Sequence, residues 1–417
     1  MRRLQTEHYS AFYSDQLVNF FHLPIRLSQW SCTAPFPLQP YQRIASYHRS
    51  KYFRAIIILR RCFAALLFSV ILSVPIFIYY VNAGEMTVFK IPLSIKLLFY
   101  LQALLQAGSL GYTLFVYQFR TSFHRFYFDR FVHVLERFGR PDISNSLSDA
   151  RTNFNRFLIA SLLLTLLVIG GILLNGHSWG NLLKIVVFII TQLMATSLTL
   201  QYQAVLTVVA VLLRQMNDTV EIMLYGTVER DQYHRGSRSH FRPTMRFTGD
   251  DEQTIEKIRL LQLQLLQIVF HTNGGEVGRM LIVVLLTIFI FLNTELLQLY
   301  QGVKARAFTF DVIGIKLTNS MLKIVMLLIF AISNRSIQKQ NLRGVTLLFQ
   351  MRSAPNSARC REITNRFITQ TTLFLANGHE AYGMVSFDMT LVLSIVAGLT
   401  NILVILIQFS DAKTSCN

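Results

Sequence analysis

The last long apolar segment of the chain, residues 386–409, carries two amide side chains in an otherwise aliphatic run. Asn401, Ile405 and Gln408 fall on one helical face because they are spaced four and three residues apart. An amide in lipid is costly unless it meets water, another polar group or its own symmetry mates. This face therefore favours a pore built from several copies of the helix, with Ile405 as a dewetting constriction below a ring of Gln408 amides. The alternatives are that Gln408 ends the helix at the lipid headgroups and that Ile405 is a packing residue.

A second set of polar and aromatic side chains lies in the outer halves of other apolar segments. Glu295 is the sharpest candidate, since an intramembrane carboxylate must be paired or face water. It could pair with Lys316 or Lys323, or contact a basic ligand such as an alkaloid. Trp179 has the alternative role of an aromatic anchor at the membrane interface. Amides, hydroxyls and aromatic faces in an apolar site suit a small organic ligand, and the candidate ligand residues are Tyr100, Gln106, Trp179, Gln192, Asn293, Glu295, Gln298 and Asn319.

Residues with catalytic or metal-binding chemistry do not form a constellation. The histidines at positions 177, 234, 240 and 271 are isolated, and no nucleotide-binding glycine loop or metal-ligand cluster appears. The four cysteines are scattered and show no C-x-x-C spacing, so we expect them to be unpaired. The sequence predicts a protein that is not an enzyme and that has no catalytic residue, metal or cofactor.

Composition indicates which elements must position these residues. The 417 residues are 52% hydrophobic and 15% charged, whereas about 25% is usual for charged residues in soluble domains. A bilayer requires roughly 20 mostly apolar residues per helix. We therefore predict an all-α membrane protein with seven transmembrane helices near Cys62–Val81, Leu97–Tyr117, Phe157–Asn175, Leu183–Leu213, Met280–Tyr300, Ile313–Asn334 and Ser386–Phe409.

The distribution of basic residues predicts the orientation. Of the 40 Lys and Arg residues, 32 precede the first span or lie in the second, fourth and sixth connections, and six lie in the other connections and the C-terminal tail. Positive residues are retained on the cytoplasmic side, so the N-terminus is expected in the cytoplasm and the C-terminus outside. This placement also explains the net charge of +18 without nucleic acid, which is not an expected partner.

The predicted organisation follows from these spans. Residues 1–61 form a cytoplasmic segment, 62–213 hold the first four spans, 214–279 a cytoplasmic loop with helical extensions, and 280–334 the fifth and sixth spans. Residues 335–385 are cytoplasmic, 386–409 form the last span, and 410–417 an extracellular tail. Ile258, Leu261, Leu265 and Ile268 recur at helical spacing and predict an amphipathic approach to the fifth span. Residues 227–256 have the composition of a disordered linker.

The C-terminal residues carry a resemblance to a known family. The run Leu403-Val404-Ile405-Leu406-Ile407-Gln408-Phe409 resembles the end of the last span in insect gustatory receptors, where a Thr-Tyr pair, five residues and Gln-Phe form a signature. Asn401-Ile402 replaces the Thr-Tyr pair, so half of the signature has changed. Phe367-Ile368-Thr369-Gln370, Ala376-Asn377-Gly378 and Asp388 also resemble that family's C-terminal block.

The resemblance implies a multi-pass cell-membrane protein of taste neuron dendrites that forms a homo- or heterotetramer. Such a receptor is a non-selective cation channel opened by a small-molecule tastant, and a bitter or aversive compound is favoured here. The pore residues that the resemblance implies are Asn401, Ile405, Gln408 and Phe409. The resemblance also implies that the ligand enters a pocket in the outer half of each subunit and that membrane lipid surrounds the protein. Two alternatives are a seven-helix receptor coupled to intracellular signalling, which requires an exterior N-terminus, and a secondary transporter, which usually shows internal repeats.

Overall fold

A computed structural model shows the chain to be helical almost throughout the part that it describes. The described residues are 2–33, 51–84, 93–119, 122–139, 143–174, 179–233, 249–304, 310–353, 357–377, 380–381 and 385–414. The helices are α1 (Arg2–Trp30), α3 (Lys51–Gly84), α4 (Leu93–Phe119), α5 (Ser122–Phe138), α6 (Ile143–Leu174), α7 (Trp179–Tyr233), α8 (Gly249–Gly274), α9 (Glu276–Lys304), α10 (Phe310–Ser353), α11 (Ala358–Asn377) and α12 (Met389–Thr414). Two short antiparallel strands, β1 (Glu380–Ala381) and β2 (Val385–Ser386), precede α12.

Each predicted span falls within an observed helix or reaches only a few residues beyond it. Five helical segments are long and apolar enough to cross a bilayer, namely Ala55–Ser73, Asn145–Leu174, Phe188–Leu224, Val277–Tyr300 and Ile313–Ser353. Shorter apolar segments, Ala103–Val116 and Met389–Ile402, lie in α4 and α12. The prediction of an all-α membrane fold is confirmed.

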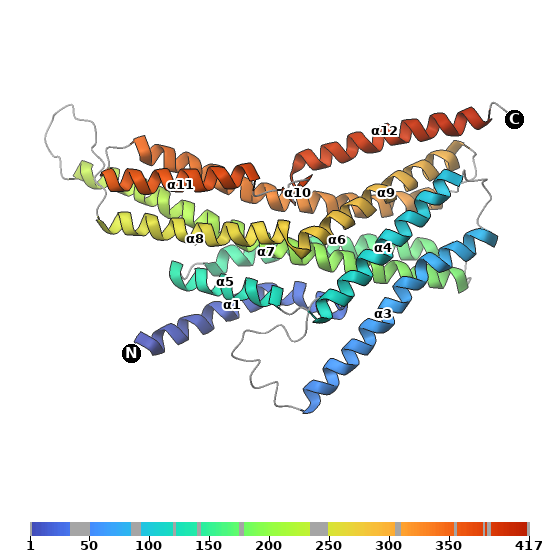
Figure 1. Cartoon of the computed structure of the whole chain (residues 1–417), viewed down its shortest axis with the longest axis horizontal. Helices are drawn as coiled ribbons and strands as arrows, with labels where there is room; N and C mark the ends of the chain where they lie inside the picture. Colours follow the sequence, from blue (N-terminus) through green and yellow to red (C-terminus); the bar gives the residue numbers. More distant parts are fainter. Residues whose placement is uncertain are drawn as a thin grey trace.

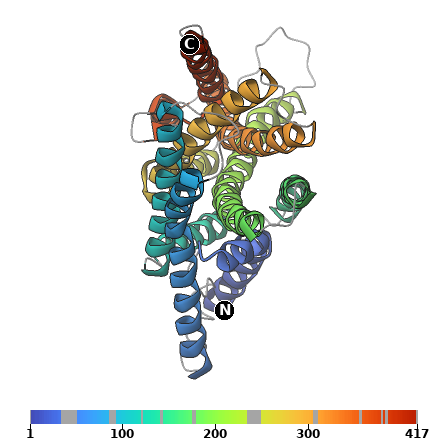
Figure 2. The ribbon, with the colours of Figure 1, turned by 90° about the vertical axis from the view of Figure 1, so that its right-hand side faces the viewer.

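The helices run along the long axis of the molecule (Figure 1). At one end lie α8, α11 and the N-terminus of α1, and at the other end lie the C-terminus and the outer end of α12. We call these the inner end and the outer end, following the orientation that the basic residues predict. Viewed along the long axis, α3 lies beside α4, and its lower end extends beyond the other helices (Figure 2).

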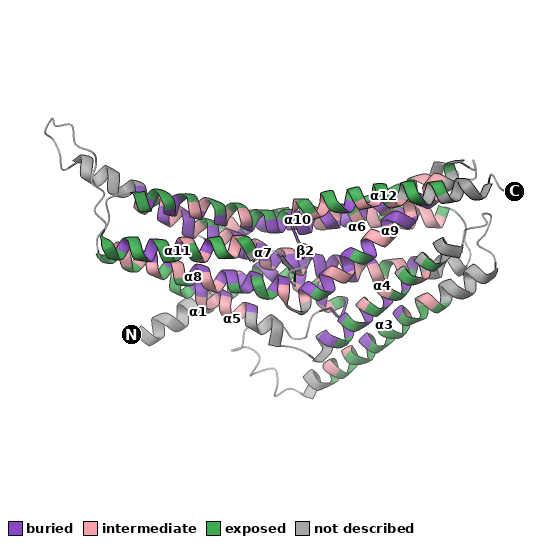
Figure 3. Ribbon diagram, turned by 45° about the horizontal axis from the view of Figure 1, so that its top comes forward, coloured by how far each residue is buried: buried purple, intermediate pink, exposed green. Residues whose placement is uncertain are grey.

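Helix α7 forms the centre of the bundle. Of the apolar window in its candidate span, 72% is buried, whereas only 11% of the window in α6 and 17% of that in α3 is buried. Leu59, Leu66 and Leu163 are examples of large side chains exposed on these two outer helices. In Figure 3 purple is frequent along the middle of α7, whereas green is frequent along α12 and α3. Exposed leucine on a helix of this kind is what lipid contact requires.

The helices α1 and α5 are additions to the predicted elements. Their side chains Leu17, Phe20 and Phe131 are buried in the same core as α7. The ring of Phe20 lies 5.4 Å from that of Phe154 in an edge-to-face arrangement, which is the preferred geometry of aromatic pairs. Thus part of the predicted N-terminal cytoplasmic segment is an integral layer of the bundle.

The connection between the fourth and fifth spans agrees in part with the prediction. Ile258, Leu261, Leu265 and Ile268 are all buried, so α8 is the amphipathic approach that their spacing predicted. The prediction of disorder over 227–256 is wrong at both ends, because α7 extends to Tyr233 and α8 begins at Gly249. Acidic residues in the first turn of α8 stabilise its N-terminus. Residues 234–248 lie outside the described part.

A break between α8 and α9 redirects the chain at the middle of the molecule. Gly274 ends α8 and Glu276 begins α9. A Cβ at Gly278 would lie 1.7 Å from the carbonyl oxygen of Asn273, and one at Gly275 would lie 2.4 Å from that of His271. Only glycine permits backbone segments to approach this closely. The two glycines therefore determine where the chain can break.

Candidate pore and ligand site

The start of α12 is anchored to the centre of the bundle. Asp388 accepts hydrogen bonds from the backbone N–H groups of Thr390 at 2.9 Å and Leu391 at 3.2 Å, and thereby caps the helix. The ring of Phe387 is fully buried and lies 6.2 Å from the ring of Tyr202 in α7. The start of α12 is therefore packed against the core of the bundle.

In the outer half of α12, most of the side chains that the structure describes are exposed. Gly398 lies against Phe289 of α9, at a distance where a Cβ would contact that ring at 3.3 Å. Beyond this point Asn401, Ile405 and Gln408 are all exposed, Ile405 by 49%. They lie away from the buried face that holds Ile395. The predicted pore residues thus share one uncovered face, except that the side chain of Phe409 lies outside the described part. The helix continues to Thr414, so the predicted tail begins as helix.

At the break between α8 and α9, three side chains from different helices form a closed ring of hydrogen bonds. The hydroxyl of Tyr202 donates to Oδ1 of Asn273 at 3.0 Å and accepts a hydrogen bond from Nδ2 of Asn334. Nδ2 of Asn273 donates to Oδ1 of Asn334 at 3.4 Å. We call Tyr202, Asn273 and Asn334 the central triad. Each member is buried and each both donates and accepts, which is what buried polar groups require.

Closer to the outer end, Glu295 pairs with Lys316. Nζ of Lys316 lies 2.8 Å from Oε2 of Glu295 and donates to Oε1 of Gln298 at 2.5 Å. The side chains of Lys316 and Glu295 are 18% and 13% exposed. The sequence left open whether Glu295 pairs with Lys316, pairs with Lys323 or contacts a ligand, and in the structure it pairs with Lys316.

The second lysine of the span, Lys323, has different partners. Its Nζ donates to Oε1 of Gln192 at 2.9 Å and lies 5.7 Å from the centre of the Phe291 ring. Gln192 is buried on α7 and donates in turn to Oγ1 of Thr196 at 3.3 Å. We call Gln192, Phe291, Glu295, Gln298, Lys316, Asn319, Ser320 and Lys323 the outer polar cluster.

The structure assembles about half of the predicted ligand residues. Gln192, Glu295 and Gln298 contact the two lysines of the outer polar cluster from α7 and α9, and Asn319 belongs to it by its place between those lysines on α10. Asn293 is buried, and its Nδ2 donates to the carbonyl oxygen of Phe289 at 2.9 Å; it faces a different side of α9, because it is two residues from both Phe291 and Glu295.

The remaining three predicted ligand residues lie elsewhere. Tyr100 and Gln106 are half-buried on α4, which packs against α3 and α9. Trp179 begins α7, and its side chain lies outside the described part.

Sequence reasoning missed Ser320 and the central triad. A signal was present, because Lys316, Ser320, Lys323, Leu327, Phe330 and Asn334 are spaced three or four residues apart and form one stripe along α10. The stripe includes residues of both the outer polar cluster and the central triad, which lie about three helical turns apart along α10. A polar stripe inside a predicted span indicates buried contacts rather than lipid.

An apolar cavity of about 50 Å³ lies beside the central triad, between α1, α5, α7 and α9. Ile25, Phe131, Val205 and Met280 are among its lining residues, and none of the predicted ligand residues is. Ligand pockets usually measure about 300 Å³ or more. This cavity is therefore too small for an organic ligand in the present conformation.

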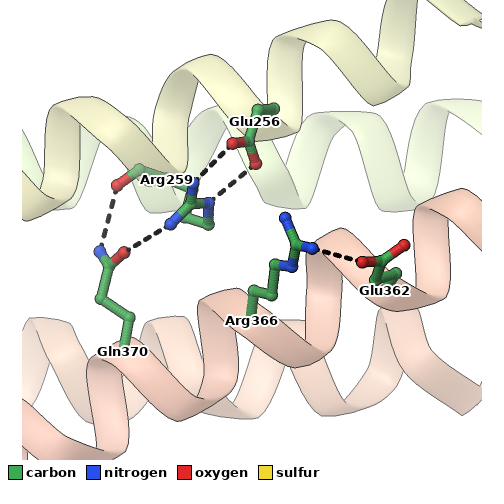
Figure 4. A network of polar contacts seen from close by, with 5 residues as sticks. All are labelled: Glu256, Arg259, Glu362, Arg366 and Gln370. Carbon is green, nitrogen blue, oxygen red and sulfur yellow. Dashed lines mark hydrogen bonds and ion pairs between the residues drawn. The ribbon is translucent and has the colours of Figure 1, made fainter.

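The inner ends of the helices are joined by charged side chains. In Figure 4 Arg259 of α8 binds both carboxylate oxygens of Glu256, and its Nη1 donates to Oε1 of Gln370 of α11 at 3.1 Å. The hydrogen bonds from Arg259 hold the pKa of the Glu256 carboxyl below its usual value. On α11, Nη2 of Arg366 lies 2.5 Å from Oε1 of Glu362. Gln370, one of the residues of the family-like C-terminal run, thus joins α11 to α8.

This arrangement defines a class of protein: a multi-pass helical membrane protein with a buried polar centre and a last helix that exposes Asn401, Ile405 and Gln408 on one face. A family model, described as the 7tm chemosensory receptor, matches residues 25–413. The chain belongs to this family of insect chemosensory receptors, whose members are ligand-gated cation channels.

Solved structures support the same fold. The chain is similar to the insect olfactory receptor OR5 from Machilis hrabei, with a TM-score of 0.62, 11% sequence identity, and coverage of 94% of this chain and 100% of that chain. The same receptor in complex with eugenol matches with a TM-score of 0.61 and 11% identity, over 94% of this chain and 99% of that one. Among curated proteins, none matches the sequence.

Proposed function

We propose that this chain is a gustatory receptor, a non-selective cation channel that a bitter or otherwise aversive small molecule opens. The single observation that carries the proposal is the uncovered face of α12, where Asn401, Ile405 and Gln408 alternate polar and aliphatic groups. An amide on such a face requires water or symmetry mates. Four chains that bring this face together form a pore with an aliphatic constriction and an amide ring.

The gustatory assignment rests on the C-terminal run that ends in Gln408-Phe409. The two solved structures reported above are both of an olfactory receptor. The assembly is a homotetramer or a heterotetramer with other gustatory receptor subunits. It acts in the cell membrane of the gustatory neuron dendrite. The ligand binds among the helices of the outer half, for which the outer polar cluster provides the polar contacts.

The test is to express the chain alone in cells with low background conductance and to apply a panel of tastants. Ile405→Ser removes the aliphatic constriction, so it is expected to raise the current without tastant. Gln408→Leu removes the amide ring and is expected to lower tastant-evoked current or change ion selectivity.

Val396→Ala is the matched control, because Val396 is a comparably exposed aliphatic residue on another face of α12. If the channel responds to tastants and neither Ile405→Ser nor Gln408→Leu alters permeation or gating, the pore assignment is wrong. An epitope at Met1 tests the orientation separately: access on intact cells would favour a conventional seven-helix signalling receptor.

A further inference from the structure

The outer half of α10 presents a line of polar side chains toward α7 and α9. Lys316, Ser320 and Lys323 share one helical face, since they are four and three residues apart, and Asn319 lies beside them. This cluster contains two cationic side chains and one carboxylate among the residues that the structure describes. The partners of the two lysines decide which kind of ligand the cluster accepts.

Lys316 already has a carboxylate counter-ion. Glu295 lies 2.8 Å from its Nζ, and Gln298 accepts a second hydrogen bond at 2.5 Å. A basic ligand would have to displace Lys316 from Glu295, and that exchange leaves a largely buried ammonium without its counter-ion. The carboxylate of Glu295, which from the sequence alone was a candidate contact for a basic ligand such as an alkaloid, is therefore already bound to Lys316 of the protein itself.

Lys323 has no carboxylate counter-ion among the described residues. Its contacts are one amide oxygen, of Gln192, and one aromatic face, of Phe291. Within the described residues no carboxylate lies at ion-pair distance from its Nζ. An amide oxygen and a distant ring compensate this partly buried ammonium less well than an anion does. The cluster consequently carries one more cation than anion.

Ser320 adds a second donor beside Lys323. Only 5% of Ser320 is exposed, and its buried hydroxyl has no hydrogen-bond partner in the described structure. Oδ1 of Asn319 is likewise buried without a partner. A buried polar atom without a partner is costly, so these atoms are better satisfied when another molecule supplies the missing groups.

We propose that Lys323 and Ser320 bind the acidic group of an organic ligand, a carboxylate or a phenolate, so that this receptor prefers acids to amines. The inference rests on the proposed function for the location of the ligand among the outer helices. The acidic oxygens accept from Nζ of Lys323 and from Oγ of Ser320, and a hydroxyl elsewhere on the ligand donates to Oδ1 of Asn319. An amine in the same place meets Lys323 as a like charge and is rejected.

The experiment uses the purified full-length chain in lipid nanodiscs. The probes are three matched series built on benzyl, phenylethyl and phenylpropyl skeletons, each with an acid, an amide and an amine. Binding is measured as the rise in thermal unfolding temperature with probe concentration. We expect at least one acid to bind about tenfold or more tightly than its amide, and the amines to bind least, since a charge-assisted hydrogen bond is worth about 1.5–3 kcal/mol.

Three variants and a control locate the effect. Lys323→Met is expected to abolish the preference for acids, Lys323→Arg to retain it, and Ser320→Ala to weaken acid binding by a smaller factor, about twofold to fivefold. Lys339→Met, an exposed lysine near the inner end of the same helix, is the control and should bind acids unchanged. Ser320→Ala keeps both lysines and the helix, so it remains informative if Lys323→Met fails to fold.

The inference is overturned if no acid binds, if amides or amines bind as tightly as acids, or if the preference survives both Lys323→Met and Ser320→Ala. Current recordings separate it from the channel proposal. A current that depends on Gln408 but not on Lys323 retains the channel and rejects the acid site. Acid binding that depends on Lys323 with no current in any variant retains the acid site and rejects the channel.

Discussion

The central triad and the outer polar cluster both place amides and hydroxyls inside the helical bundle, but they differ in completeness. In the central triad every side chain donates and accepts, so Tyr202, Asn273 and Asn334 satisfy one another. In the outer polar cluster Ser320 and Asn319 keep buried atoms without partners. A complete buried group specifies one packing of its helices, whereas an incomplete group is suited to exchange partners with a ligand. Both regions include residues of α10, and of the two only the outer polar cluster has described buried polar atoms without a partner.

The largest expected effect concerns the backbone that supports the triad. Gly278→Ala places a Cβ 1.7 Å from the carbonyl oxygen of Asn273, and backbone cannot yield as a flexible side chain does. We expect a loss of about 3 kcal/mol or more in stability, seen as a large drop in the thermal unfolding temperature. Gly108→Ala is the control, because a Cβ added there would meet no neighbouring atom within 4 Å. Equal unfolding temperatures for the two variants would contradict this geometry.

Removing one hydroxyl tests whether the triad is complete. Tyr202→Phe leaves Asn273 without its donor and Asn334 without its acceptor at a buried site, and we expect a loss of about 2 kcal/mol. Thermal unfolding measures the loss, and Tyr112→Phe on the exposed face of α4 is the matched control. Because Phe387 at the foot of α12 packs on the same ring, a shift in the tastant concentration for half-maximal current is also expected. A wild-type unfolding temperature would show that the ring of hydrogen bonds contributes nothing.

The two lysines sharpen the comparison within the outer polar cluster. Lys316→Met leaves Glu295 without its counter-ion and is expected to lower stability by about 1–2 kcal/mol, less than for a fully buried pair because both side chains retain some exposure. Adding Glu295→Gln to Lys316→Met should restore most of the lost stability, because the unpaired carboxylate is then removed. Lys323→Met removes an unmatched cation, so its stability is expected to stay within about 1 kcal/mol of wild type. The reverse order of unfolding temperatures would mean that Lys323 is the structural lysine.

The smallest effect is a pH dependence at the inner end. The pKa of Glu256 is lowered by the hydrogen bonds from Arg259, so the stabilisation is present above the ordinary value of 4.5 and is lost as the pH falls through the lower folded-state pKa. Because the pair is partly exposed, Glu256→Gln is expected to cost less than about 1 kcal/mol at neutral pH and to flatten this part of the stability profile. Glu362→Gln, in a more exposed pair, is the control. If Glu256→Gln left the dependence of stability on pH unchanged, the pair of Glu256 and Arg259 would not contribute to that dependence.

The membrane helices were predictable because lipid imposes a simple rule on sequence. Apolar runs of sufficient length mark spans, and the spacing of Ile258, Leu261, Leu265 and Ile268 identified the buried face of α8. Helix α1 was not predicted, since its apolar residues are interrupted by charged ones and include Pro24. Only its packing against α7 and α5 buries Leu17 and Phe20.

The candidate site was predictable in its residue types but not in its pairs. The sequence identified Glu295 and both lysines, yet the choice between Lys316 and Lys323 depends on the relative register of α9 and α10. No local pattern fixes that register. The central triad unites residues that are 71 and 61 positions apart in sequence, so it requires the fold itself.

Helix α7 is unbroken over 55 residues and is therefore about 80 Å long, more than twice the thickness of the hydrocarbon layer. It contacts Lys323 through Gln192 near one end, and near the other Asp218 lies 2.7 Å from Arg343. An unbroken helix of this length behaves as a lever: a small tilt about its buried middle displaces its two ends in opposite directions. A rearrangement on binding at the proposed outer site would therefore displace the inner end of α7 sideways, without any part of the helix having to unwind.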